Sequence, residues 1–302
     1  MFNEQDKQRF IDNINLDQYP DNYWNALFNK TQSIEEMYGK DLYNFSKIEI
    51  TSLYKYLDSK SFDYIRVINF NLIKYAQWAM SEALIVDGQN HYAELTTNEI
   101  SECINKFGFN ESILTKDTVY SLLPQISSAR DRFSIIATYE GLKGINYCEI
   151  IRSNIADISG NKMKLVTGRT VDVSDKLVAL ATEASEERIY ISPAGKNFET
   201  YGDYGSIYRT LREDFNEEYA SKRFQKVFRN ILDTLGMSRY ITLNSLFTSG
   251  LIDKINQFAD QDNITAEEVL RNEKYLEYLK NQYGYNRKIT KTFLLKYKDF
   301  LR

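Results

Sequence analysis

Residues 162–177 read KMKLVTGRTVDVSDKL, and this stretch decides the fold class. Apolar residues alternate with polar ones on the two sides of a Thr-Gly pair: Met163, Leu165, Val171 and Val173. Alternation around a glycine turn predicts a β-hairpin. Ser174 then stands where its hydroxyl can cap a helix over residues 175–184. Residues 188–192 are predicted to supply a third short strand.

The part of the chain before this hairpin has a helical pattern. One apolar stripe steps by three and four residues, as on an amphipathic helix: Ile65, Ile68, Leu72, Tyr75 and Ala79. Ser46, with Glu49 three residues later, predicts a capping box, and a helix over residues 23–38 is predicted to end at Gly39. Three regions follow: a helical domain over 1–90, a linker over 91–114 with a short helix at 98–107, and a second domain over 115–302.

Chain breakers and histidine are both scarce. The 302 residues include 3 prolines and 13 glycines, which favours long helices over an all-β design. We therefore expect a mainly helical fold with a small antiparallel sheet. The single histidine, His91, largely excludes a Ser-His-Asp triad or a metal site built on two histidines. No cofactor and no metal are expected.

Cysteine usage and the N-terminus indicate the compartment. Cys103 and Cys148 are too few for a disulfide framework, which favours a reducing environment. The first ten residues, MFNEQDKQRF, are polar and unlike a signal peptide. No apolar run approaches the roughly 20 residues that a membrane-spanning helix needs. We expect a soluble, cytoplasmic protein with no membrane partner.

The net charge of −4 is unevenly distributed along the chain. Residues 1–110 carry 10 Lys and Arg against 16 Asp and Glu, whereas residues 201–302 carry 17 against 14. An amphipathic helix over 220–235 contributes four cations largely opposite its apolar face: Lys222, Arg223, Lys226 and Arg229. Such a helix can enter a DNA groove or lie along phosphates, although solvated outer faces of helices are often charged as well.

The C-terminal region continues this basic character. Thr265 is predicted to begin a helix that ends at Gly284, with Glu268 at the capping-box position. The tail after it combines cations with apolar residues at helical spacing: Arg287, Lys288, Lys291, Lys296, Lys298, Phe293, Leu294, Tyr297, Phe300 and Leu301. We expect this tail to dock on its own domain or on a neighbouring subunit, which would give a homodimer or a higher oligomer.

The order of these elements is similar to that of the tyrosine recombinase (phage integrase) family. Residues 38–57, YGKDLYNFSKIEITSLYKYL, resemble the SAM-like core-binding domain of phage integrases. Residues 139–143, YEGLK, with Glu149-Ile150 and residues 155–158, resemble the stretch that carries the family's first catalytic arginine. The hairpin matches the strands of the catalytic lysine, and ITLNSLFTSGLI at 241–252 stands where the His-x-x-Arg box belongs.

Several positions depart from the family's catalytic set, which holds a scissile phosphate while a tyrosine attacks it. Lys143, or Arg152 in another alignment, matches the first arginine, and Lys164 matches the catalytic lysine. Asn244 and Phe247 match the His-x-x-Arg box, and Tyr285 matches the third His/Trp position. Tyr297 is the available nucleophile, although family spacing points nearer Leu294. Phe247 offers neither charge nor donor, and Lys143 lacks the bidentate fork of arginine. We therefore expect no catalytic residues.

The resemblance still implies binding of double-stranded DNA. The expected DNA-binding residues are cations of the second domain: Lys164, Arg169, Lys222, Arg223, Lys226, Arg229 and Arg239. The chain resembles integrase-like lysogeny repressors of SPbeta-type Bacillus prophages, which implies a nucleoid-associated transcriptional repressor with a phage protein or peptide as a further partner. The first alternative is an atypical active recombinase with Lys143, Arg152, Lys164 and Arg169 on the phosphate and Tyr297 as nucleophile. The second alternative is a protein-interaction module without DNA binding.

Overall fold

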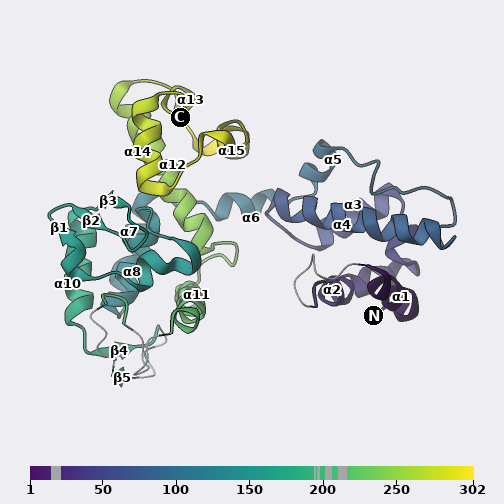
Figure 1. Ribbon diagram of the computed structural model, residues 1–302, viewed down its shortest axis with the longest axis horizontal. Coiled ribbons are helices and arrows are strands. Elements are labelled where there is room, and N and C mark those ends of the chain that lie inside the picture. Colours follow the sequence, from purple (N-terminus) through teal and green to yellow (C-terminus); the bar gives the residue numbers. More distant parts are fainter. Residues whose placement is uncertain (15–21, 194, 196–197, 201–205, 210–215) are drawn as a thin grey trace. The chain divides into compact units, whose positions relative to one another are not determined.

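The computed structural model describes residues 1–14, 22–193, 195, 198–200, 206–209 and 216–302 (Figure 1). The chain divides into two compact units, residues 1–110 and residues 111–302. Each unit has its own apolar core, so each is described separately. The expected fold class, mainly helical with a small antiparallel sheet, is confirmed. Within the described residues, no helix combines the length and the apolarity that crossing a membrane requires.

In its described residues, 1–14 and 22–110, the first unit contains helices and no strand. Its helices are α1 (Glu4–Asn13), α2 (Tyr23–Tyr38), α3 (Lys47–Tyr56), α4 (Phe62–Ser81), α5 (Thr97–Glu102) and most of α6 (Lys106–Glu111). The predicted stripe on α4 is buried, the predicted Ser46 capping box is present, and α2 ends at Gly39 with φ +62°. Residues 91–110 contribute α5 and side chains to this core, because Ile100 and Cys103 are buried and the Tyr92 hydroxyl donates to the Leu42 carbonyl at 2.9 Å.

A buried ion pair lies inside the first unit. The Lys7 ammonium on α1 lies 2.6 Å from the Glu35 carboxylate on α2 and 3.9 Å from Asp41. Thr31 and the backbone N–H of Leu42 also donate to Glu35. Burial raises the pKa of Glu35 to about 7, although Lys7 acts in the opposite direction. Lys7 and Glu35 therefore each have partners inside the core.

Helix α8 runs through the middle of the second unit. The unit contains α7 (Lys116–Leu122), α8 (Ala129–Tyr139), α9 (Cys148–Ile151), α10 (Asp175–Glu186), α11 (Glu217–Thr234) and α12 (Leu243–Asp262). All residues of α8 except Arg132 are buried, and α10 and α12 make many contacts with it. Thr115 caps α7 as predicted.

The predicted hairpin is confirmed. Strands β1 (Ile158–Ser159), β2 (Lys162–Lys164) and β3 (Thr170–Asp172) form one antiparallel sheet, with Met163 opposite Val171, and Ser174 caps α10. The strand predicted at 188–192 forms as β4 (Ile189–Ile191), but it pairs with β5 (Phe198–Thr200) in a separate sheet. The expectation that it completes the hairpin's sheet is therefore wrong. Gly160, with φ +56°, lets the chain turn directly from β1 into β2, so a local strand takes that place.

The C-terminal segment packs on its own unit. The helix predicted over 265–284 is divided into α13 (Ala266–Val269) and α14 (Glu273–Tyr283), because Asn272 caps a new helix. The tail forms α15 (Thr290–Tyr297), whose Phe293 is buried in the cluster that α12 and α14 also build. The Ala266 N–H donates to the Arg302 carbonyl at 2.7 Å. Of the two docking places expected for the tail, its own domain is the one observed.

Candidate nucleic-acid interface

The two positions that match the family's arginines lie together. The Lys143 ammonium, in the loop after α8, lies 5.2 Å from the centre of the Phe247 ring on α12. Phe247 packs edge-on against Tyr283 at the end of α14, with ring centres 5.6 Å apart. Burial lowers the pKa of Lys143. An aromatic contact therefore fills the place where the resemblance puts a second phosphate-binding arginine.

Two glycines allow the helices to approach closely enough for this arrangement. At Gly250 on α12, a Cβ would lie 1.6 Å from the Tyr139 carbonyl oxygen. At Gly141, which has φ +103°, a Cβ would lie 2.5 Å from the Gln282 carbonyl oxygen. Any side chain at either position would push α12 or the end of α14 away from α8. The glycines thus fix the distance between Lys143, Phe247 and Tyr283.

Glu149 and Arg169 form the polar support beside these rings. The Glu149 carboxylate, which is 2% exposed, accepts from Arg169 at 2.9 Å and from the Lys143 backbone N–H at 2.8 Å. Burial alone would raise the pKa of Glu149, but the hydrogen bonds from Arg169, Thr167 and the Lys143 N–H hold it below its ordinary value. Arg169 also donates to the carbonyls of Asn281 and Gln282. Its guanidinium therefore joins the hairpin to α14 inside the unit.

The remaining residues of the expected catalytic set are distributed over the unit. Lys164 is exposed on β2, Asn244 is exposed in the first turn of α12, and Arg152 pairs with Glu217 at 2.5 Å. Tyr285 is buried and donates to Thr290 at 3.1 Å. The ring centres of Tyr285 and Tyr297 lie 5.7 Å and 4.7 Å from that of Phe293. Both tyrosines thus belong to the packing of the C-terminal tail.

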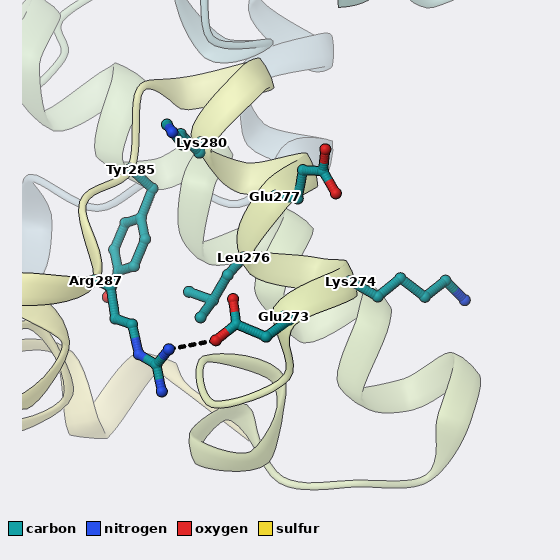
Figure 2. Close-up of a pocket in the computed structure, with 7 residues that line it drawn as sticks. All are labelled: Glu273, Lys274, Leu276, Glu277, Lys280, Tyr285 and Arg287. Carbon is teal, nitrogen blue, oxygen red and sulfur yellow. Dashed lines mark hydrogen bonds and ion pairs between the residues drawn. The ribbon is translucent and has the colours of Figure 1, made fainter.

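Tyr285 also lines a shallow hollow of about 410 Å³ against α14 (Figure 2). Arg287 forms an ion pair with Glu273 across it, while Lys274 and Glu277 point away from the tyrosine ring. With Lys280, the lining of this hollow contains three cations and two carboxylates. This mixture of charges makes the hollow a poor candidate for binding a phosphate.

The outer face of α11 carries the basic cluster predicted from the sequence. Lys222, Lys226 and Arg229 step by four and three residues along α11, whereas Phe224 and Phe228 are buried. Lys226 is exposed, and Lys222 pairs with Glu218, each side chain of the pair being 75% exposed. Helix α11 begins at Glu217, three residues earlier than predicted, because Asn216 accepts from the Tyr219 N–H.

Three further expected DNA-binding residues lie on or beside this face. Arg229 pairs with Asp233 and donates to the Arg239 carbonyl at 3.1 Å, which ties α11 to the loop before α12. Arg239 is exposed and lies over the Tyr240 ring, whereas Arg223 is half-buried near Tyr190. Two exposed lysines and two arginines therefore form one basic surface, which we call the α11 face (Lys222, Lys226, Arg229 and Arg239).

The sequence analysis missed a second basic surface, on the outer side of α4 in the first unit. There Lys74 lies over the Phe70 ring at 4.7 Å, and Lys30 of α2 lies over the Tyr64 ring at 5.3 Å. Phe70 is 57% exposed. The exposed Phe70 followed by Lys74 four residues later was a readable signal for this outer face, whereas the Lys30–Tyr64 contact joins two helices and has no local signal.

A helical first unit followed by a second unit with a three-stranded sheet is the organisation of an integrase-like two-domain protein. Residues 1–81 match the family described as "MrpR, N-terminal core-binding domain", and residues 113–301 match "MrpR, C-terminal catalytic domain". The chain belongs to the MrpR family. It is similar to the SPbeta prophage-derived uncharacterized protein YopR of Bacillus subtilis (strain 168), with 21% identity over 288 residues that cover 89% of this chain and 86% of the relative.

Proposed function

We propose that this chain is a sequence-specific double-stranded DNA-binding protein on a non-catalytic recombinase scaffold, acting as a transcriptional repressor of a phage or prophage. The observation that carries the proposal is the Lys143–Phe247–Tyr283 contact, because it fills with aromatic rings a place where phosphate-binding groups are required. The prophage origin of the similar YopR protein supports a phage context.

The proposed loss of catalysis follows from the groups that surround Phe247. A phosphoryl-transfer transition state needs fixed donors around the non-bridging oxygens, and losing one such donor costs about 3 kcal/mol. Phe247 has no donor, and the guanidinium of Arg169 is committed to Glu149 and to backbone carbonyls. The Lys143 ammonium, held over a ring, lacks the two parallel N–H groups of an arginine. Strand cleavage would therefore be very slow.

The binding part follows from the α11 face. Its lysines and arginines can each neutralise a phosphate and release condensed counterions, which makes affinity strongly dependent on salt. The outer face of α4 offers cations beside exposed aromatic rings and would contact the same duplex from the first unit. The two units would then hold DNA together, with base contacts supplying the sequence preference.

Genome-wide footprinting in the phage host would locate the site. Fluorescence anisotropy on that DNA at about 50 mM and about 200 mM salt should then show an affinity that falls steeply with salt. Absence of binding to any footprinted or prophage fragment at low salt would overturn the proposal and favour a protein-interaction module.

Catalysis is tested separately with a nicked suicide substrate that traps covalent protein–DNA intermediates. We expect no adduct from the full chain. An adduct that disappears in Tyr297→Phe would identify an active recombinase with Tyr297 as nucleophile, and the non-catalytic part of the proposal would be wrong.

A further inference from the structure

A short turn between α8 and α9 holds an apolar side chain in solvent. The turn is a single 3₁₀ turn, Ile145–Tyr147, and one residue separates it from Lys143. Ile145 is 81% exposed, and Asn146 beside it is exposed as well. Single exposed apolar residues are common on protein surfaces, so the backbone that carries this one decides whether its exposure is significant.

The backbone of this turn is strained. Asn146 has φ +51° and Tyr147 has φ +62°, both in the left-handed region. Asparagine tolerates this region, whereas a tyrosine there is an outlier because its Cβ comes close to the following carbonyl oxygen. Two successive residues in this conformation persist only where the surrounding structure fixes them, and such strain is concentrated at binding and active sites. The turn is therefore a candidate binding element.

Contacts on both sides of the turn fix this conformation. Before it, the Lys143 N–H donates to the Glu149 carboxylate at 2.8 Å, and the Glu149 N–H donates to the Lys143 carbonyl at 3.4 Å. At its end, the Tyr147 ring packs edge-on against Phe224 of α11, with ring centres 5.1 Å apart. The turn thus connects Lys143 to α11, and its other two side chains, Ile145 and Asn146, remain in solvent.

The chemistry of these two side chains suits base edges better than phosphates. Neither is charged, so neither can neutralise a phosphate. In the major groove, an A·T pair presents an acceptor and a donor on adenine and a methyl group on thymine. An asparagine amide matches the adenine edge, and an apolar side chain can contact the thymine methyl. Two side chains on a narrow turn are too small a surface for a stable protein–protein interface, which buries about 800 Å² on each partner.

We propose that Ile145 and Asn146 read neighbouring A·T base pairs in the major groove, with Ile145 against a thymine methyl and the Asn146 amide on an adenine edge. The proposal rests on the proposed function, because it names residues that would supply the sequence preference. The turn is tied to α11, whose outer side carries the α11 face. Cations on that face would provide affinity for any duplex, and the turn would discriminate among sequences.

Fluorescence anisotropy with the full chain tests the contact of Ile145. Ile145→Ala should weaken binding to the footprinted DNA about tenfold and leave binding to a duplex of shuffled sequence unchanged. Each thymine of the site is then replaced in turn by deoxyuridine, which lacks only the methyl group. At one position or more, the replacement should weaken binding of the parent chain about fourfold, the equivalent of one lost methyl contact. The same replacement should have no effect on Ile145→Ala, because the contact is already absent.

Asn146→Gly tests the second contact, since glycine keeps the left-handed backbone while the amide is removed. This variant should lose its discrimination at one adenine, which 7-deazaadenine at that position identifies by removing the acceptor. The matched control is Ile289→Ala, which truncates an isoleucine of the C-terminal tail that is 48% exposed and should leave DNA affinity unchanged. Far-UV circular dichroism checks that each variant is folded. Ile145→Ala should melt like the parent chain, because the side chain is in solvent.

Three results would overturn the proposal while the proposed function stands: full affinity of Ile145→Ala for the footprinted DNA, an equal loss on the shuffled duplex, or no thymine whose methyl matters more to the parent chain than to Ile145→Ala. A parent chain that binds no DNA would contradict the proposed function, and this inference would fall with it. The affinity of the parent chain for the footprinted DNA therefore separates the two failures.

Discussion

The surroundings of Phe247 and the α11 face use the same cationic residue types in opposite ways. Beside Phe247, Arg169 donates to a buried carboxylate and to backbone carbonyls, and the Lys143 ammonium lies over an aromatic ring. On the α11 face, Lys226 is exposed and Lys222 pairs with an exposed glutamate, Glu218. A cation that donates to buried acceptors stabilises the fold. A cation in solvent can instead exchange its bound water for a phosphate.

The sharpest way to test the first half of this comparison is to remove the acceptor of Arg169. In Glu149→Gln, the half-buried Arg169 guanidinium loses its charged partner, so the free energy of unfolding should fall by about 3 kcal/mol. Urea denaturation followed by circular dichroism measures this change. The matched control is Glu218→Gln, which breaks the exposed pair with Lys222 and should leave the free energy of unfolding nearly unchanged. Equal effects in the two variants would contradict the distinction.

The second half of the comparison predicts a loss of DNA affinity without a loss of stability. Replacing Lys222 and Lys226 together by alanine should weaken DNA binding about tenfold at low salt and reduce the salt dependence by about two counterions. The control removes two exposed lysines of α14, Lys274 and Lys280, and should leave affinity nearly unchanged. Anisotropy titrations at several salt concentrations measure both quantities. An unchanged salt slope in the α11 variant would show that this face does not contact phosphates.

The buried Lys7–Glu35 pair of the first unit predicts that stability depends on pH. Because burial raises the pKa of Glu35 to about 7, the folded chain binds this proton more tightly than the unfolded chain does. Stability from this group is therefore present below the ordinary glutamate pKa and is lost as pH rises toward 7, with a slope below about 1.4 kcal/mol per pH unit. Chemical denaturation from pH 5 to pH 7 should show a flatter profile in Glu35→Gln. A flatter pH profile of stability in the unmodified chain than in Glu35→Gln would show that Lys7 keeps Glu35 ionised from pH 5 to pH 7.

The smallest effect is expected at Tyr297. Its ring packs on Phe293 in the tail, and removal of its hydroxyl should change DNA affinity by less than about twofold, since uncharged side chains outside a phosphate contact contribute little to binding. Anisotropy on the footprinted DNA measures this. A large loss of DNA affinity in Tyr297→Phe would show that the tail contacts DNA in addition to the α11 face.

Local signals predicted most of the helices correctly. The Ser46 capping box, the end of α2 at Gly39, the stripe of α4 and the cap of α7 all depend on residues within one or two turns. Failures occurred where a local pattern allowed more than one outcome. Residues 188–192 form a strand, but which strand they pair with was undetermined, and Asn272 divides a helix whose apolar spacing continues across the break. The partner of a strand and the point where a helix is interrupted depend on residues outside the local stretch of sequence.

The sequence by itself determined the helical class, the hairpin and its cap, the basic face of α11 and the absence of arginine at position 247. These follow from residue type and spacing, which act over short distances along the chain. Only the tertiary structure decided that Phe247 packs between Lys143 and Tyr283, that Arg169 serves Glu149, and that the tail docks on its own unit. These contacts join residues that are distant in the sequence. Whether a charge is buried with a partner or left in solvent is therefore set by packing and not by the residue's identity.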